Sequence, residues 1–127
     1  MDGLANAKVI TFILTRDRAA STTWYAEVLG LPVVAADDGF ASVLDLNGTL
    51  LRITQIDGYE ASAHPALGWE VPDIAAVIGT LVSRGVTMTI YEGFGQDALG
   101  VWTSPDGKAK VAWFNDPDGN VLSLTQT

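Results

Sequence analysis

The side chain best suited to hold a ligand is the guanidinium of Arg52, which follows the dipeptide Asn47-Gly48. An Asn-Gly pair between two apolar runs is typical of a two-residue hairpin turn, which places Val43 opposite Arg52. Alternation along the strands then puts Arg52 and Asp45 on one sheet face, opposite the face that is richer in leucine. A guanidinium there can grip a carboxylate, a phosphate or another planar anion through paired hydrogen bonds. The alternative is a structural ion pair between Arg52 and Asp45.

A second group of side chains could contact a flat aromatic ligand. Tyr91, Phe94 and Trp102 lie in or beside the glycine-rich segment 91–102, which is interpreted as a mobile lid. Ser123 stands alone among leucines and is either a polar contact to the ligand or a small lining residue. No Ser-His-Asp arrangement can be placed, so nucleophilic catalysis has no support.

The composition favours one folded domain with an acidic surface. The chain has 127 residues, 48% of them apolar, which is enough for one core. Its net charge of -8 argues against nucleic acid and anionic membranes as partners. The sequence shows no signal peptide, no apolar run long enough to cross a membrane and no cysteine. We therefore expect a cytoplasmic protein.

The elements that position these residues occur twice. A β-branched run leads into a helix from Arg18 to Leu29, which Asp17 caps and Gly30 ends. After the restart, Asp73 caps a second helix that ends at Gly85. The predicted strands are residues 8–15, 32–37, 39–46, 49–56, 67–71, 86–91, 109–115 and 120–126.

Each half therefore reads strand, helix and three strands, which is an internal repeat. Residues 8–56 form module one, residues 57–66 a linker and residues 67–127 module two, all within a single domain. The expected fold class is α+β, with two βαβββ modules that form a curved eight-stranded mixed sheet around a cleft. The helices are expected on the outside.

Three stretches carry a family resemblance: WYAEVLGLPVV at 24–34, LGWEVPDI at 67–74 and KVAWFNDPDGNVLSL at 110–124. With them the chain resembles the vicinal oxygen chelate superfamily, also called the glyoxalase/bleomycin resistance protein/dioxygenase superfamily. In the DPDGN turn, Pro117 presets φ and Gly119 supplies the positive φ that closes the turn. The resemblance implies the two-module fold and a homodimer. The family includes lyases, isomerases, ring-cleaving dioxygenases and proteins that only bind antibiotics.

The resemblance also implies that the enzymes of this family hold a divalent metal ion through His, Glu or Gln. The corresponding positions of this sequence are Ile10 or Thr11, Arg52, Ala66 and Ser123. None of these is a usual ligand, because such ions prefer imidazole and carboxylate donors. The single imidazole, on His64, falls in the linker two residues before the expected position. A divalent metal is therefore possible but disfavoured, and we expect no cofactor.

Three hypotheses follow. The first is a metal-independent binding protein of the bleomycin-resistance type, which sequesters a planar or anionic drug or metabolite. The second is a lyase or isomerase of the glyoxalase type, which uses a divalent metal or a carboxylate base, Asp45 or Glu70. The third is a structural or interaction protein with a filled cleft. The sequence leaves catalytic residues undefined, and the candidate ligand contacts are Arg52, Asp45, Trp102, Tyr91, Phe94 and Ser123.

Overall fold

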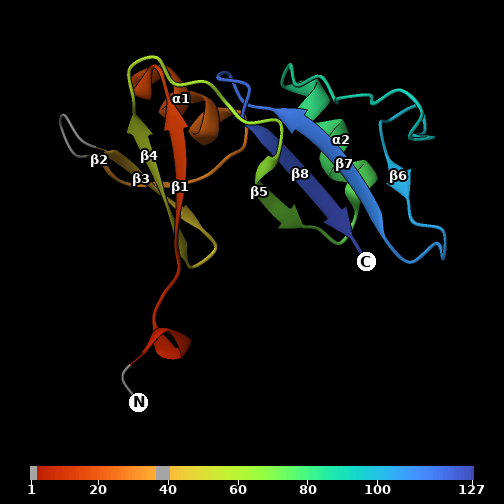
Figure 1. The fold of residues 1–127 in the computed structure, drawn as a ribbon, viewed down its shortest axis with the longest axis horizontal. Coiled ribbons are helices and arrows are strands. Elements are labelled where there is room, and N and C mark those ends of the chain that lie inside the picture. Colours follow the sequence, from red (N-terminus) through yellow and green to blue (C-terminus); the bar gives the residue numbers. More distant parts are fainter. Residues whose placement is uncertain (1–2, 37–40) are drawn as a thin grey trace. The chain divides into compact units, whose positions relative to one another are not determined.

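The computed structural model describes residues 3–36 and 41–127, and the chain divides into two compact units, Met1–Tyr59 and Glu60–Thr127 (Figure 1). Each unit has one ten-residue α-helix and one four-stranded mixed sheet, in the order strand, helix and three strands. The predicted α+β class and the two βαβββ modules are confirmed. None of the helices among the described residues is long and apolar enough to cross a membrane.

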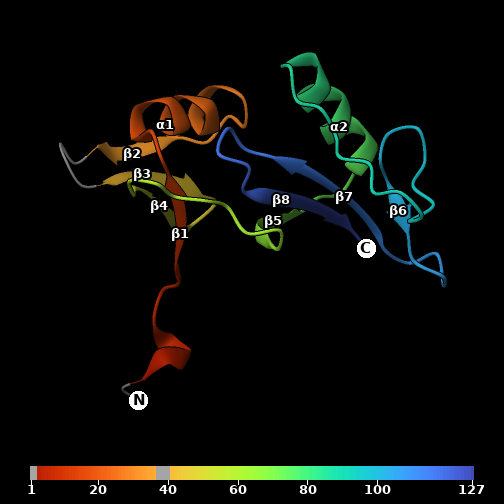
Figure 2. The same cartoon turned by 45° about the horizontal axis from the view of Figure 1, so that its top comes forward.

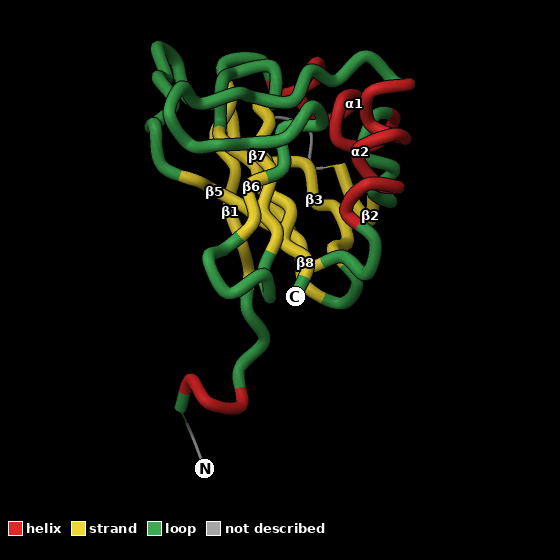
Figure 3. The backbone as a smooth tube through the Cα atoms, turned by 90° about the vertical axis from the view of Figure 1, so that its right-hand side faces the viewer, coloured by secondary structure: helices red, strands yellow, loops and turns green. Residues whose placement is uncertain are grey.

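Unit 1 follows the predicted order of elements. Its sheet order is β1-β4-β3-β2, with β1 parallel to β4 and the other neighbours antiparallel. Helix α1 covers one face of this sheet, and the one-turn helix η1 stands off the start of β1 (Figures 2 and 3). Residues 37, 39 and 40 of the predicted strands lie outside the described residues. The elements are η1 (Leu4–Asn6), β1 (Ile10–Thr15), α1 (Arg18–Glu27), β2 (Val33–Ala36), β3 (Ala41–Leu46) and β4 (Thr49–Gln55).

Two polar side chains satisfy the first turn of α1. The carboxylate of Asp17 accepts a hydrogen bond from the backbone N–H of Ala20 at 3.1 Å, as predicted for an N-cap. The side-chain oxygen of Gln55, at the end of β4, accepts a hydrogen bond from the backbone N–H of Arg18 at 2.9 Å. Gly30 follows the helix with φ 74°, a conformation that glycine adopts without strain.

The core of unit 1 lies between α1 and the sheet. Ser21 and Tyr25 are the buried residues of the helix, and the hydroxyl of Thr22 donates to Ser42 Oγ on β3 at 2.8 Å. Strand pairing places four buried side chains of the sheet on this same face, while the small buried Ala41 lies on the other face. The four are Ile13, Leu44, Leu51 and Ile53. The other face carries Arg52 and is called the open face of unit 1.

Unit 2 repeats this plan with one difference. Its sheet order is β5-β8-β7-β6, with β5 parallel to β8. The strand predicted at 86–91 is wrong, because β6 is instead formed by two residues much later in the chain. The elements are β5 (Pro65–Glu70), α2 (Ile74–Ser83), β6 (Trp102–Thr103), β7 (Lys110–Asn115) and β8 (Val121–Gln126).

The wrong prediction has a physical reason. Val86 and Met88 are both buried, so the alternation that indicated a strand reflects a half-buried chain. A strand also needs a ladder of backbone hydrogen bonds, and alternation does not report it. The backbone N–H of Thr89 donates to the carbonyl of Trp113 at 2.8 Å, which fastens this segment to β7 without forming a strand.

The start of α2 is satisfied as in α1. Asp73 accepts a hydrogen bond from the backbone N–H of Ala76 at 3.1 Å, and Gln126 Oε1 accepts one from the backbone N–H of Ile74 at 2.8 Å. Gly85 has φ 92° and ends the helix as predicted. The buried apolar residues of α2 and of the two central strands are Ile74, Ile78, Leu81, Ala112, Phe114, Val121, Leu122 and Leu124.

Candidate functional site

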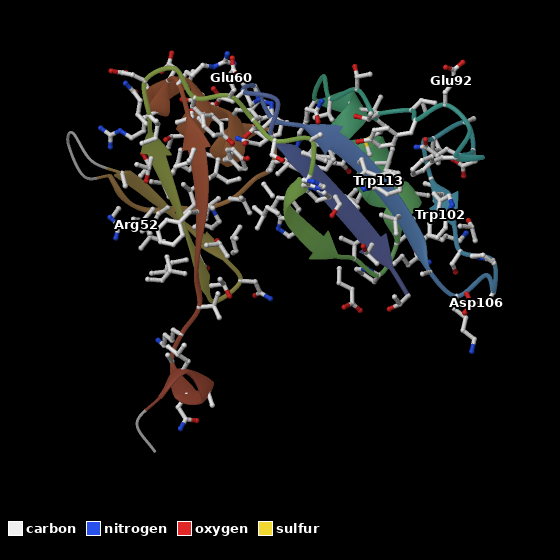
Figure 4. The ribbon with its side chains drawn as sticks, in the orientation of Figure 1. Arg52, Glu60, Glu92, Trp102, Asp106 and Trp113 are labelled. Atoms are coloured by element: carbon white, nitrogen blue, oxygen red, sulfur yellow. The ribbon has the colours of Figure 1, made fainter. Side chains whose placement is uncertain are left out.

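The open face of unit 1 carries a row of three side chains from neighbouring strands. The pairing of β1, β4 and β3 places Phe12, Arg52 and Val43 side by side, with Arg52 in the middle. Figure 4 labels Arg52 on β4. The turn at Asn47-Gly48 fixes this register, because both residues have a positive φ, 55° and 101°. The predictions that Val43 is opposite Arg52 and that Arg52 and Asp45 share a face are confirmed.

Arg52 is half-buried among apolar neighbours on this face. Phe12 is 61% exposed, and Ile10 and Leu50, the pair next to it in the ladder, are 45% and 38% exposed. Apolar neighbours keep water away from a guanidinium, which strengthens its hydrogen bonds to a bound anion. Among the described residues of this face, the guanidinium therefore has mainly apolar neighbours, with the carboxylate of Asp45 on the same face.

The alternative partner of Arg52 is engaged elsewhere. The carboxylate of Asp45 accepts a hydrogen bond from the backbone N–H of Gly48 at 2.8 Å, within the hairpin turn. Over residues 3–36 and 41–127, the side chain of Arg52 makes no hydrogen bond or ion pair. The alternative ion pair between Arg52 and Asp45 is thus not formed among these residues.

The open face of unit 2, the face turned away from α2, carries the corresponding row. Gly68 on β5, Ser123 on β8 and Trp113 on β7 are paired side by side. Ser123 stands between Leu122 and Leu124, which are buried on the helix side, so its hydroxyl lies on the open face. The predicted polar contact, Ser123, is therefore next to an indole ring.

Three rings of unit 2 form what we call the aromatic cluster: Tyr91, Phe94 and Trp113. Their ring centroids are 5.4 Å (Tyr91 to Phe94), 5.5 Å (Tyr91 to Trp113) and 6.1 Å (Phe94 to Trp113) apart. Trp113 meets both of the other rings edge to face, a favourable arrangement of aromatic quadrupoles. Tyr91 and Phe94, two of the candidate ligand contacts, thus lie together around a tryptophan of the sheet.

Trp113 is the residue that sequence reasoning missed. The predicted third ring, Trp102, lies on β6 and is paired with Val111, two residues along β7 from Trp113 (Figure 4). The signal was present in KVAWFN at 110–115, where Ala112 and Phe114 alternate with Trp113. Following the hairpin back from the DPDGN turn would have paired Trp113 with Ser123.

The side chain of Gln96 holds the segment that carries the cluster. Its Oε1 accepts a hydrogen bond from the backbone N–H of Tyr91 at 2.6 Å, and its Nε2 donates to the carbonyls of Thr89 at 2.9 Å and Gly100 at 2.7 Å. These three bonds join both ends of the loop through one amide. The segment interpreted as a lid is therefore tied to itself and, through Thr89, to β7.

The positions implied for metal ligands do not fit a divalent metal ion. Arg52 is cationic, and Ser123 offers a neutral hydroxyl where the family's carboxylate is expected. Ile10 has no donor atom, and the neutral hydroxyl of Thr11 donates to the carbonyl of Leu50 at 3.1 Å. Ala66 lies where the pairing of β5 with β8 shifts register. His64 is exposed and precedes β5. In the part of the chain that the structure describes, no three His, Cys, Asp or Glu side chains form a group able to hold a metal.

Comparison with known proteins agrees with the fold. The sequence profile of the Glyoxalase/Bleomycin resistance protein/Dioxygenase superfamily matches residues 8–124. The chain belongs to this superfamily. No curated protein matches it.

Solved structures of this superfamily fold are similar to the chain. The glyoxalase family protein from Enterococcus faecalis has a TM-score of 0.68 at 22% identity, covering 93% of this chain and 94% of that one. Lactoylglutathione lyase from Agrobacterium tumefaciens has a TM-score of 0.71 at 15% identity, covering 95% and 93%. The fosfomycin resistance protein FosX from Listeria monocytogenes has a TM-score of 0.73 at 12% identity, covering 100% and 94%. At these identities the likeness shows the fold alone.

Proposed function

We propose that this superfamily member is a small-molecule binding protein that holds its ligand without a metal ion. One observation carries the proposal: the strand positions that the resemblance assigns to metal ligands hold Arg52 and Ser123, both on open sheet faces. A guanidinium repels a cation but binds a carboxylate or phosphate through two parallel hydrogen bonds. The proposed ligand is therefore planar or anionic.

Membership of the superfamily supports a small-molecule ligand, and the names of the similar structures leave turnover open. Their names include a lyase and a resistance protein. A second candidate, a lyase or isomerase of the glyoxalase type, draws on carboxylates that lie on the open faces. Glu70 shares a row with Thr125, and its Oε1 accepts a hydrogen bond from the Thr127 hydroxyl at 3.3 Å. Glu70 and Asp45 are the candidate bases.

The test is calorimetric titration of the whole protein, treated with a chelator, with benzoate, salicylate, inorganic phosphate and methylphosphonate. At least one anion should bind, and Arg52→Gln should weaken it about tenfold or more, because a charged hydrogen bond contributes about 1.5–3 kcal/mol. The affinity of Arg52→Lys, which keeps the charge and loses the planar fork, should lie between those of the unchanged protein and Arg52→Gln. Arg84→Gln removes the same charge at an exposed position just after α2 and should leave the affinity unchanged.

Three results would oppose the proposal. The first is that no anion binds, and the second is that binding needs stoichiometric nickel, zinc, manganese or iron(II). The third is turnover of a hemithioacetal that is lost in Glu70→Gln or Asp45→Asn, which would favour the lyase instead.

The homodimer is a further proposal, since open sheets leave edge strands that invite pairing, and light scattering after gel filtration tests it.

A further inference from the structure

The row on the open face of unit 2 contains a glycine where a side chain would collide with its neighbour. A Cβ at Gly68 would lie 2.5 Å from Ser123 Oγ, closer than real Cβ atoms come to any heavy atom. The hydroxyl of Ser123 therefore occupies the volume that any other residue at position 68 would fill. It points toward β5 and away from Trp113, the opposite neighbour in the row.

The backbone does not require a glycine at this position. Gly68 is not one of the glycines with positive φ, so an L-residue could adopt its conformation. The corresponding position of unit 1 is Phe12, whose side chain is 61% exposed on the open face. A large side chain is thus compatible with this place in the fold. What the glycine provides in unit 2 is room for the hydroxyl of Ser123.

That hydroxyl is available to a ligand. Ser123 is half-buried, and within residues 3–36 and 41–127 its Oγ makes no hydrogen bond. On the other side of the row, the indole of Trp113 is fixed by its edge-to-face contacts with Tyr91 and Phe94. The row therefore combines a free donor and acceptor with a flat apolar surface in a fixed orientation.

We propose that the row Gly68–Ser123–Trp113 binds a flat ring that carries a polar substituent, and that Gly68 determines its specificity by fixing the direction of the Ser123 hydroxyl. This inference rests on the proposed small-molecule binding function and names a ligand class for unit 2. The ring contacts the indole, and its polar group pairs with the hydroxyl. A side chain at position 68 turns Ser123 to another rotamer, and the pairing is lost.

The test compares phenol with toluene, which have the same shape and differ in a hydroxyl against a methyl group. Binding to the whole protein is followed by NMR through the indole N–H of Trp113. Phenol should bind roughly fivefold more tightly than toluene, the effect of one hydrogen bond. This ratio should fall to about one in Gly68→Ala and in Ser123→Ala, which removes the hydroxyl and adds no atom.

Gly79→Ala is the matched control. Gly79 is an exposed glycine of α2 with nothing within 4 Å of an added Cβ, so the same substitution should leave the ratio unchanged. A ligand-free measurement completes the design: three-bond couplings of Ser123 report its χ1, which should change in Gly68→Ala and stay the same in Gly79→Ala.

The outcomes separate the two proposals. An unchanged ratio in Gly68→Ala, or an unchanged χ1 of Ser123, overturns the role of Gly68. If neither probe moves the Trp113 signal, the unit 2 site is overturned, whereas the anion titration of Arg52 still decides the binding function. If no anion binds, but phenol is preferred to toluene and Gly68→Ala removes this preference, the proposed Arg52 site is wrong and the proposal for unit 2 is supported.

Discussion

Units 1 and 2 share their framework closely and differ in what they display. In each, an Asp caps the helix and a Gln at the end of the last strand reaches back to the helix start: Asp17 and Gln55, Asp73 and Gln126. In each, the central strands pair in the same way. The repeat is therefore conserved in the residues that close the helix onto the sheet.

The open faces have diverged on this common framework. Phe12, Arg52 and Val43 stand in unit 1 where Gly68, Ser123 and Trp113 stand in unit 2. The aromatic side chain is on the outer strand in one row and on an inner strand in the other. Side chains of the open face do not contact the helix of their own unit, so they are free to change chemistry. The residues that build the common fold are therefore different from those that line the two proposed ligand sites.

The largest predicted effect concerns the loop of unit 2 that Gln96 holds beside β7. The corresponding edge of unit 1, beside β3, is formed by strand β2. Gln96→Leu removes three hydrogen bonds to backbone groups, and we expect a loss of about 3 kcal/mol in the free energy of unfolding of unit 2. Hydrogen exchange of the amides of residues 89–101 measures it.

Gln55→Leu is the control for this substitution, because its side chain accepts one exposed hydrogen bond and should cost about 1 kcal/mol in unit 1. Equal losses for the two variants would show that the clamp adds nothing beyond a single bond.

The next effect has the opposite sign. Ser21 of α1 is 1% exposed, and its Oγ has no hydrogen-bond partner among the described residues, whereas the corresponding residue of α2 is Val77. Ser21→Ala should therefore raise the stability by about 1.5 kcal/mol, because an unpaired buried hydroxyl is removed and alanine favours the helix.

Thermal and urea unfolding measure this gain. Ser83→Ala is the matched control, since that exposed serine donates to the carbonyl of Thr80 at 2.6 Å and should change stability little. A destabilised Ser21→Ala variant would mean that a bound water satisfies the hydroxyl.

A smaller effect tests the shared framework. Asp17→Ala and Asp73→Ala should each cost about 1 kcal/mol, the usual contribution of an N-cap, and Asp→Asn at either position should cost only a few tenths because the amide oxygen still accepts. Urea unfolding of the four variants measures the costs. If the losses of unfolding free energy in Asp17→Ala and Asp73→Ala differ by about 1 kcal/mol, the two caps share their geometry but do not contribute equally to stability.

The smallest effect is a pH dependence in a turn that unit 1 lacks. The carboxylate of Asp106 accepts hydrogen bonds from the Ser104 hydroxyl at 2.6 Å and the Lys108 N–H at 3.0 Å, and they lower its pKa from the ordinary 3.8. Because the pKa of Asp106 is lower in the folded turn than in the unfolded chain, the ionised carboxylate stabilises the folded turn at pH values above the unfolded-chain pKa. This stabilisation is lost below about pH 4, as the pH falls through the pKa of the folded state.

Ser104→Ala removes the first of these bonds, so the pKa of Asp106 should rise toward 3.8. An NMR titration of the Asp106 carboxyl follows it, with Ser62→Ala as a control. An unmoved pKa would assign the shift to the backbone N–H of Lys108.

Local signals made much of this predictable. Asp17 and Asp73 mark the helix starts within a few residues, and Asn47-Gly48 fixes the register that puts Arg52 on the open face. The failures depend on partners distant in the sequence. The place of Trp113 beside Tyr91 and Phe94 needs the fold of a loop, and the edge of β7 is filled by residues 102–103 instead of the expected 86–91. The spacing of apolar residues predicts which positions are buried, but it does not predict which backbone groups form hydrogen bonds with one another.

The two glutamines that reach back to the helices also set an order of events during synthesis. The N-terminus of α1 is completed by a residue 37 positions away and that of α2 by one 52 positions away. On the ribosome, unit 1 can satisfy its helix once Gln55 has emerged, while α2 has to wait until Gln126 is translated. The first half of the chain can thus finish folding while the second still has an incomplete helix start.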